Sequence, residues 1–355
     1  MSGPPIAVVV VTYENAGRIA ATLSALVTQL ESDDELVVVD NASRDGTAAT
    51  VREAIPRVRV LEQDRNLGFA GGCNAGAAAC TAPLMLFLNP DAEMAAGCLN
   101  ALRHAAGERP GWGAWQALVT MRRGREINSS GGVTHFLGMG WAGSCGEPVK
   151  AAPGGPAEVS FASGAALVVR REAWQAVGGF EERYFMYGED LDLGLRMWLG
   201  GYGVGVVPAA RVEHDYEFAK GRRKWLLLER NRWWTVLSDY PTGLLLAVLP
   251  ALLAAEAALL LVAARGGWLR AKLRAQAAVL RELPQILARR REVQARRVLG
   301  AALLAERLSA SLDNPYLAGE ARIRTLGALQ SGYWAGVRAV FQLLGFRPDP
   351  RSKAG

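Results

Sequence analysis

The chain has 355 residues, of which 50% are hydrophobic and 21% are charged, and its net charge is +6. This length is sufficient for one large domain or for two smaller ones, each with its own core. Ten Lys or Arg and two Glu fall within residues 265–297, so that segment carries +8 and the rest of the chain carries −2. The excess of basic residues is therefore confined to one segment, and the charge pattern excludes a nucleic-acid-binding core. Nucleic acid is not expected among the partners.

The four cysteines form no CxxC pair and show no metal-ligand spacing, which is typical of free thiols in a reducing compartment. The N-terminus enters directly into the apolar run Ile6–Val11, with no basic region and cleavage site of a signal peptide before it. We therefore expect the part of the chain that carries the chemistry to lie in the cytoplasm.

The first 90 residues alternate short apolar runs with stretches of helical period. Helices are predicted over residues 19–30, Thr47–Ile55 and Gly71–Cys80. Strands buried on both faces are predicted over Ile6–Val11, Leu36–Val39, Val58–Leu61 and Leu84–Leu88. Strands and helices that alternate at this pace predict an α/β fold with βαβ units and a mostly parallel sheet.

Polar residues follow the ends of these strands, and ligands of such sheets bind beyond the carboxyl ends of the strands. Asp40 can accept the imide N–H of a pyrimidine, and Asp91 is placed to hold a divalent cation through hard oxygen ligands. The glycines after Asn66 let the backbone approach a nucleotide, although they form neither GxGxxG nor a P-loop. A lone Asp after a strand is also a common turn residue, so these roles depend on the loops acting as one site.

The segment Met186–Arg196 places three carboxylates at the start of a predicted helix, and Val159–Val169 before it predicts a strand that returns to the sheet. Asp192 and Arg196 are four residues apart, so we expect them to pair on one helix face. Asp190 lies at or near the helix cap, where free backbone N–H groups stabilise a carboxylate. The alternative interpretation is that Asp190 is an N-cap and nothing more.

An apolar helix is predicted over residues 243–264, and the basic segment 265–297 follows it. The helix is long enough to span a membrane, but it contains Pro250 and, near its middle, Glu256, whose charge disfavours a simple span. A spanning, re-entrant or in-plane membrane helix and a core or oligomer-packing helix all stay open. The basic segment fits a membrane surface or a solvated charged face equally well.

Seven stretches of the chain carry a resemblance when they are taken in order. They are VVVVTYENAGRIAATLSAL, ELVVVDNASRDGT, NLGFAGGCNAG, FLNPDAE, FASGAALVVRREAW, VGGFEERYFMYGEDLDLGLR and PAARVEHDYE. Together they resemble the family 2 glycosyltransferases of the GT-A fold, and within that family the rhamnosyltransferase-like branch. The resemblance implies a Rossmann-like GT-A catalytic domain over residues 1–240, followed over residues 241–355 by a C-terminal helical, membrane-associating region.

The resemblance implies catalytic and metal-binding roles for four positions. Asp190 matches the general base. Asp91 and His214 match ligands of Mg²⁺ or Mn²⁺, and Asn89 stands where the family's DxD motif has its first carboxylate. Supporting or acceptor-contacting roles are implied for Glu189, Asp192 and Arg196.

Nucleotide-sugar binding is implied for the strand-end loops. Asp40 matches the residue that reads the base, whereas Glu14 stands where the family usually has Asn. The implied nucleotide-sugar-binding residues are Thr12, Tyr13, Glu14, Asp40, Asn41, Asn66, Gly68, Phe69, Gly72, Asn74 and Asn89.

We therefore expect an inverting hexosyltransferase that moves a sugar from a nucleotide-diphosphate donor to a hydroxyl of a lipid-linked or glycan acceptor in cell-envelope polysaccharide biosynthesis. The first donor candidate is dTDP-rhamnose, and UDP-sugars such as UDP-galactofuranose or UDP-GlcNAc come second. The expected location is the cytoplasmic face of the cell membrane, with a homo-oligomer allowed. Alternatives from other classes are a sugar nucleotidyltransferase, whose glycine-rich basic signature is missing after the first strand, and a non-catalytic nucleotide-sugar-binding subunit.

Overall fold

The structure is a computed structural model that describes residues 3–56, 58–215, 221–311 and 322–343. The chain forms two compact units. The first comprises residues 1–132, 142–197 and 202–216, and the second comprises residues 133–141, 198–201 and 217–355. Every residue predicted to form the site belongs to the first unit.

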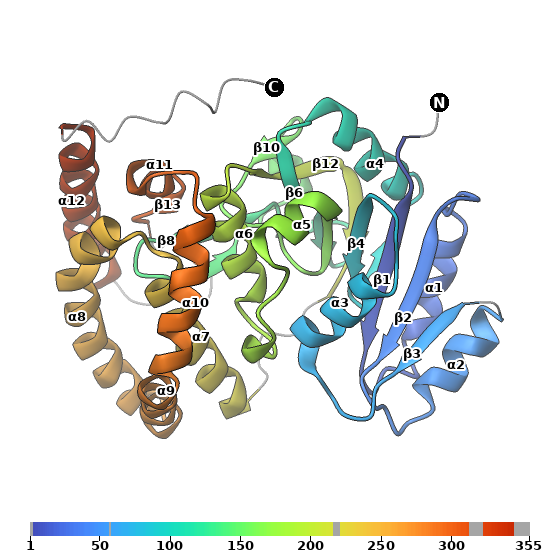
Figure 1. The fold of residues 1–355 in the computed structure, drawn as a ribbon, viewed down its shortest axis with the longest axis horizontal. Coiled ribbons are helices and arrows are strands. Elements are labelled where there is room, and N and C mark those ends of the chain that lie inside the picture. The colour runs from blue at the N-terminus through green and yellow to red at the C-terminus, as the bar shows by residue number, and fades with distance from the viewer. Residues whose placement is uncertain (1–2, 57, 216–220, 312–321, 344–355) are drawn as a thin grey trace. The chain divides into compact units, whose positions relative to one another are not determined.

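The first unit is built on a large central sheet (Figure 1). Its strands are β1 (Ile6–Thr12), β2 (Glu35–Asp40), β3 (Arg59–Glu62), β4 (Leu84–Leu88), β5 (Glu93–Met94), β6 (Trp112–Met121), β7 (Glu126–Ser129), β10 (Ala157–Glu158), β11 (Ala166–Arg170) and β12 (Gly203–Glu213). Their order is β10–β12–β6–β11–β4–β1–β2–β3, with β5 beside β12 and β7 beside β6. The sheet is parallel from β4 to β3, whereas β11 runs antiparallel to both β4 and β6.

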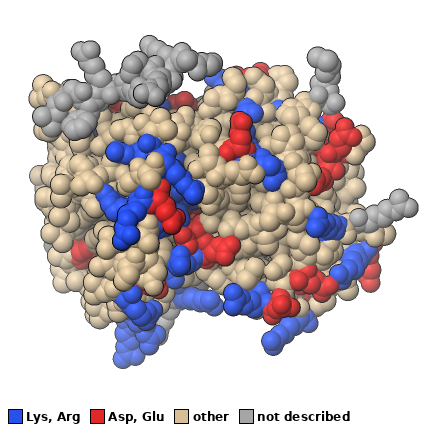
Figure 2. All heavy atoms as spheres, in the orientation of Figure 1, with Lys and Arg blue, Asp and Glu red and all other residues tan. Residues whose placement is uncertain are grey.

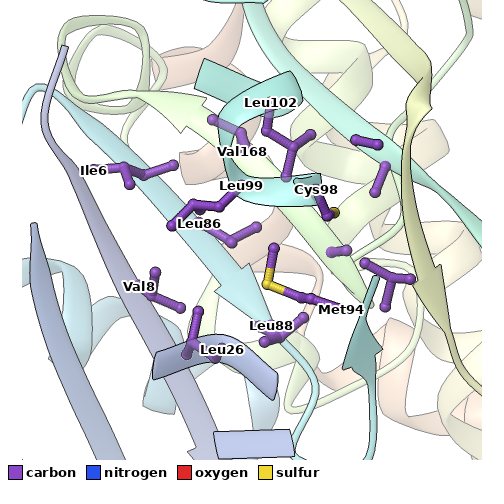
Figure 3. Packing of buried hydrophobic residues seen from close by; sticks show 14 of the residues in the cluster. Ile6, Val8, Leu26, Leu86, Leu88, Met94, Cys98, Leu99, Leu102 and Val168 are labelled. Carbon is purple, nitrogen blue, oxygen red and sulfur yellow. The ribbon is translucent and has the colours of Figure 1, made fainter. Parts of the chain in front are cut away.

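Helices cover both faces of the parallel half of the sheet. One face carries α1 (Ile19–Val27), α2 (Thr47–Ala54) and α4 (Cys98–Glu108), and the other carries α3 (Gly68–Ala78) and α5 (Arg171–Val177). Successive residues of β1 alternate between them: Ile6 and Val8 join the core under α1 and α4 (Figure 3), and Val9 and Val11 meet α3. Burial on both faces explains why β1 reads as a continuous apolar run. The α/β prediction is confirmed, but the central sheet is mixed and not mostly parallel, because five of its nine strand pairings are antiparallel.

The strand predicted over Val159–Val169 is wrong in its first half, because only Ala166–Arg170 is a strand. The N–H groups just before it bond to side chains instead of to a neighbouring strand. The N–H of Ser163 donates to Oε1 of Gln116 at 2.7 Å, and that of Gly164 donates to a carboxylate of the site described below.

The second unit is helical in the part that the structure describes, apart from a small sheet of β8 (Gly132–His135), β9 (Gly140–Ala142) and β13 (Leu308–Ser309). Its helices are α7 (Gly221–Asp239), α8 (Thr242–Arg265), α9 (Leu269–Arg281), α10 (Leu283–Arg296), α11 (Ala301–Glu306) and α12 (Arg322–Leu343). Helix α7 packs against α9 and α10, so the unit begins before residue 240, where the sequence placed the domain boundary. By length and composition, α8 is the one described helix that could cross a membrane.

The substitution Gly76→Ala tests how closely α3 packs on the sheet. A Cβ at Gly76 would lie 2.2 Å from Cγ1 of Val9, which is fully buried and has no room to withdraw. We expect this overpacking to lower the free energy of unfolding by about 1–3 kcal/mol in urea denaturation. Gly17→Ala is the control, since nothing lies within 4 Å of a Cβ added there. Equal losses in the two variants would contradict the packing described for α3.

Candidate active site

The carboxyl ends of β1 and β2 bring two predicted nucleotide-binding residues side by side, because Thr12 and Asp40 are register partners. Asp40 is buried, and its carboxylate accepts hydrogen bonds from both the backbone N–H and the hydroxyl of Ser43. Glu14 holds the same loop, since its carboxylate accepts from the N–H of Arg44 and its own N–H donates to Ser43 Oγ. Ser43 therefore joins the loops that follow the two strands.

Two buried side-chain oxygens at this edge of the sheet have no hydrogen-bond partner among the described residues. They are Thr12 Oγ1 and Asn41 Oδ1. An unpaired buried polar atom costs about 1–3 kcal/mol, so a ligand that donates a hydrogen bond here would be favoured. Tyr13, which follows Thr12, is 49% exposed and presents an aromatic ring at the same strand end. These atoms suit a polar, planar ligand such as a nucleotide base.

Gly68, at the start of α3, allows the backbone of this helix to lie close to the backbone of Phe185. Gly68 has a φ of +74°, and a Cβ there would lie 2.2 Å from the carbonyl oxygen of Phe185. Its N–H donates to Asn66 Oδ1, and its carbonyl accepts from Asn41 Nδ2 at 2.9 Å. The N–H of Ala70 donates to the same Phe185 carbonyl at 3.2 Å. The start of α3 thus touches the segment that precedes Asp190.

Gly72 and Asn74, which the sequence grouped with the nucleotide loop, both make contacts within the protein. A Cβ at Gly72 would lie 2.5 Å from Cγ1 of Val11, so the glycine permits close helix–strand packing. Asn74 Nδ2 donates to the carbonyl of Phe180 and to the carboxylate of Glu182, and its Oδ1 accepts from the N–H of Phe180. Because these protein groups engage both ends of the amide, its evident role is to hold the segment before α6 (Glu189–Leu199).

Asn89, Asp91 and His214 come together, although 125 residues separate Asn89 from His214. Nε2 of His214 lies 3.2 Å from Oδ1 of Asp91 and 3.4 Å from Nδ2 of Asn89, and Nη1 of Arg18 lies 3.6 Å from Oδ2 of Asp91. Within the described residues, no group of three or more His, Cys, Asp or Glu could hold a metal ion. A carboxylate and an imidazole this close fit a divalent cation that takes its other ligands from phosphate and water.

Two neighbouring backbone groups hold Asp190 and Asn89. The N–H of Gly164 donates to Oδ2 of Asp190 at 3.2 Å, and the carbonyl of Ala165 accepts from the N–H of Asn89 at 3.0 Å. Phe69 of α3 packs on the same segment, since a Cβ at Gly164 would lie 2.9 Å from its ring. The segment of Gly164 and Ala165 therefore contacts the candidate base, the residue two before Asp91, and α3.

The turn that leads into α6 has an unfavourable backbone. Phe185 and Tyr187 have φ values of 64° and 70°, in the left-handed region that non-glycine residues rarely adopt. Such conformations persist where the surrounding structure imposes them, and they concentrate at functional sites. Here the N–H of Ala70 holds the Phe185 carbonyl, as described above, so contacts with α3 impose the turn.

Asp192 and Arg196 form the ion pair predicted from their spacing. Nε of Arg196 donates to Oδ2 of Asp192 at 3.0 Å, its Nη1 donates to the carbonyl of Val177, and the hydroxyl of Tyr184 donates to Oδ1 of Asp192. Asp192 is 0% exposed and Arg196 is 3% exposed. Because both are buried, they position α6 and have no surface to offer an acceptor.

Two adjacent carboxylates at the start of α6 have perturbed acidities. Burial raises the pKa of Asp190, and the N–H groups of Gly164 and Leu191 offset that rise only in part. Burial raises the pKa of Glu189 well above its ordinary value, and the neighbouring Asp190 adds to the rise. No hydrogen-bond partner among the described residues reaches the buried Oε2 of Glu189. A carboxylate whose pKa is raised toward neutrality is suited to accept a proton.

Four residues of this arrangement were not assigned roles from the sequence: Arg18, Ser43, Gly164 and Phe185. Gly164 had a usable signal, because a glycine inside an apolar strand pattern marks a bulge or a close approach. The other three are ordinary loop or turn residues by composition, and only their contacts across the fold distinguish them.

A mixed sheet whose parallel half has polar groups beyond its strand ends is typical of an α/β protein whose ligand site lies at that edge. The family model for glycosyl transferase family 2 matches residues 7–120, and the model for glycosyl transferase family group 2 matches residues 85–279. The chain is also 33% identical over 240 residues to an N-acetylglucosaminyl-diphospho-decaprenol L-rhamnosyltransferase of Mycobacterium tuberculosis, a match that covers 61% of this chain and 77% of that protein. The chain belongs to glycosyltransferase family 2.

Solved structures share the fold. A mannosyltransferase from Pyrobaculum calidifontis, in complex with GDP-Man and Mn²⁺, aligns with a TM-score of 0.51 at 22% identity, over 96% of this chain and 87% of that chain. GalNAc-T7 with UDP, GalNAc and Mn²⁺ aligns with a TM-score of 0.56 at 16% identity, over 68% of this chain and 49% of that chain. The prediction of a GT-A-like fold is confirmed.

The substitution Asp192→Asn tests the anchor of α6. It leaves the guanidinium of Arg196 buried without its charged partner, so we expect the free energy of unfolding to fall by about 3–5 kcal/mol. Glu62→Gln is the matched control, because Glu62 pairs with Arg52 on the surface, where both side chains are more than half exposed. Its expected effect is below about 1 kcal/mol. Urea denaturation of both variants makes the comparison, and equal effects would contradict a buried anchor.

Proposed function

We propose that this glycosyltransferase transfers rhamnose from dTDP-rhamnose, with inversion, to a hydroxyl of a lipid-linked saccharide. The observation that carries the proposal is that the adjacent residues Gly164 and Ala165 hold Asp190 and Asn89, and that Asn89 lies beside the Asp91–His214 pair. Inverting transfer needs a base for the acceptor and positive charge at the leaving diphosphate, and these residues are suited to those two tasks. The name of the M. tuberculosis relative, which describes rhamnosyl transfer to an N-acetylglucosaminyl-diphospho-decaprenol, supports the sugar and the acceptor class.

In the proposed reaction, a carboxylate oxygen of Asp190 accepts the proton of the acceptor hydroxyl while the hydroxyl oxygen attacks the anomeric carbon. Attack comes from the face opposite the diphosphate, and the bond between the anomeric carbon and the diphosphate oxygen breaks. Configuration therefore inverts, and no covalent intermediate on the protein is required. The N–H of Gly164 orients the carboxylate, and the raised pKa of Asp190 makes it a stronger base.

Asp91 and His214 would hold Mg²⁺ or Mn²⁺, which when bound supplies positive charge to the departing diphosphate. Asn89 contributes no charge where the DxD motif of the family has its first carboxylate, and Arg18 adds a positive charge beside Asp91. The two solved neighbours, each described with a nucleotide or nucleotide sugar and Mn²⁺, support a divalent cation as cofactor.

The nucleotide is proposed to bind at the ends of β1 and β2. Asp40 acts only as an acceptor in its contacts with Ser43, which suits the imide N–H of thymine or uracil. Thr12 and Asn41 offer the unpaired oxygens described above, and Tyr13 offers a ring for stacking. A UDP-sugar donor, such as UDP-galactofuranose or UDP-GlcNAc, is the second candidate, because uracil presents the same imide.

The reaction is proposed to occur on the cytoplasmic face of the cell membrane, within cell-envelope polysaccharide biosynthesis. The apolar helix α8 and the decaprenol-linked substrate in the name of the relative support this location. The family assignment favours this function over the nucleotidyltransferase and the non-catalytic subunit considered from the sequence.

Replacing the proposed base by Asp190→Asn keeps the shape of the side chain and removes its proton acceptor. We expect transfer to fall about 10²–10⁴-fold, while nucleotide binding is retained. In the unmodified enzyme, the rate should fall as the pH drops through the raised pKa of Asp190, above the value of 3.8 that is ordinary for Asp. Since a raised carboxyl pKa means that ionisation destabilises the folded state, Asp190→Asn should also raise the melting temperature. Asp33→Asn, on the exposed surface, is the control, and unchanged transfer by Asp190→Asn would remove the base assignment.

Calorimetric titration with dTDP, UDP and GDP, each with and without Mn²⁺, tests the donor site. We expect dTDP or UDP to bind in preference to GDP, with Mn²⁺ strengthening the binding. Asp40→Asn should weaken binding by about 10–100-fold, the size expected for a hydrogen bond to a charged group. Asp91→Asn should remove most of the gain from Mn²⁺. Binding that ignores Mn²⁺ would contradict the roles of Asp91 and His214.

A further inference from the structure

Helix α8 (Thr242–Arg265) has two unlike faces. On one face, Leu244, Val248 and Leu252 are buried at four-residue spacing, and Glu256 continues the same row. The exposed large apolar side chains of the helix are Leu246, Leu249, Leu253, Leu261 and Val262, and exposed Arg265 ends it. A row of exposed leucines of this length indicates a surface that a partner covers.

The buried face of α8, which includes Glu256, contacts other helices of the second unit. The carboxylate of Glu256 accepts hydrogen bonds from Arg232 of α7 and, at 2.9 and 2.8 Å, from Lys272 and Gln276 of α9. Lys272 is fully buried and also donates to Glu229 of α7 at 2.6 Å. The charge that interrupts the apolar run in the sequence is therefore the point at which three helices are joined.

This ion cluster restricts how α8 can meet a membrane. A helix that crossed the bilayer would place Glu256 in the hydrocarbon near its middle, where a charge is costly. Separating Glu256 from Arg232 and Lys272 would strand buried charges, and keeping them together would draw α9 into the bilayer with its exposed Arg270 and Arg274. An in-plane orientation avoids both costs, because the charged face stays on α7 and α9 while the apolar face enters the lipid.

The neighbouring helices present a surface of the same character. Leu273 and Leu280 of α9 are 50% and 72% exposed, and exposed arginines lie among them on that helix. Figure 2 shows Lys and Arg side chains gathered over α9 and α10, in keeping with the ten basic and two acidic residues of 265–297. Apolar side chains among positive charges match an anionic lipid surface. A second copy of this chain would bring the same positive segment and be repelled.

We propose that α8 lies in the plane of an anionic membrane surface, with its exposed leucines among the acyl chains and the arginines of α9 and α10 at the lipid phosphates. The inference rests on the proposed function for a lipid-linked acceptor and adds the way in which the chain meets the membrane. The helix does not cross the bilayer, and both of its ends stay on one side.

Cysteine labelling at the two ends of α8 tests this topology. Gly243→Cys and Arg265→Cys are made separately in a full-length Cys145→Ser chain, whose other three cysteines are buried. Inside-out membrane vesicles from expressing cells are treated with a membrane-impermeant maleimide, and the Cys145→Ser parent gives the background. Both cysteines should react before detergent is added. Protection of one end until detergent opens the vesicles would demonstrate a span and overturn the proposal, as would absence of the chain from the vesicles.

Sedimentation of the purified chain with lipid vesicles tests whether the surface binds anionic lipid. Binding should be at least about tenfold stronger to vesicles with anionic phospholipid than to neutral ones, and it should weaken with salt. Arg274→Gln should weaken binding about fivefold, whereas Arg52→Gln on α2, in the other unit, should not change it. Leu253→Ser should weaken it through the apolar face.

The alternative occupant is a second copy of the chain. The proposal would be overturned in favour of self-association by two results together. The chain would bind neither kind of vesicle, and it would elute as a dimer that Leu253→Ser converts to a monomer. Neither readout requires turnover. Asp190→Asn should therefore bind vesicles like the unmodified chain, so a failure of the proposed reaction and a failure of the membrane proposal give different results.

Discussion

The N–H of Gly164 holds the carboxylate of Asp190, while the carbonyl of the next residue, Ala165, holds the N–H of Asn89. These two hydrogen bonds tie the candidate base to the segment that holds Asn89, which lies beside His214 and two residues before Asp91. The first is available because the chain leaves the sheet ladder just before β11, so the N–H of Gly164 contacts a side chain. The second extends the pairing of β11 with β4 by one residue. In the proposed inverting transfer, the base and the charge at the leaving group must keep a constant separation, and this backbone segment would provide it.

The start of α6 carries a free-energy cost that the rest of the first unit offsets. Burial raises the pKa of both Asp190 and Glu189, and the preceding turn keeps Phe185 and Tyr187 in the left-handed region. The buried Asp192–Arg196 pair and the contacts of α3 with the turn hold these unfavourable features in place. An unfavourable environment at the candidate base and a buried anchor in the same helix are consistent with a preorganised site.

In the second unit, a buried cluster of charged side chains fixes the orientation of α8. Glu256, Lys272 and Arg232 neutralise one another inside a helical bundle, and the long apolar side of α8 is left uncovered. A buried ion cluster contributes little net stability, but it fixes which face of a helix turns inward. By fixing that face, the cluster also determines which side chains remain for a membrane surface.

Local order in the sequence was enough for the βαβ alternation, the apolar length of α8, the pairing of Asp192 with Arg196 and the choice of Asp190, Asp91 and His214 as candidates. Each of these depends on neighbours a few residues apart or on the order of short motifs. The packing role of Gly72, the capture of Asn74 by Phe180, the place of Gly164 and the inward turn of Glu256 came only with the tertiary structure. They depend on which groups meet across 16 to 125 residues of chain, as Glu256 meets Lys272 and Asn89 meets His214. Hydrophobic periodicity in the sequence indicates which face of one element is buried. Contacts between residues far apart in the chain depend on how the elements pack together.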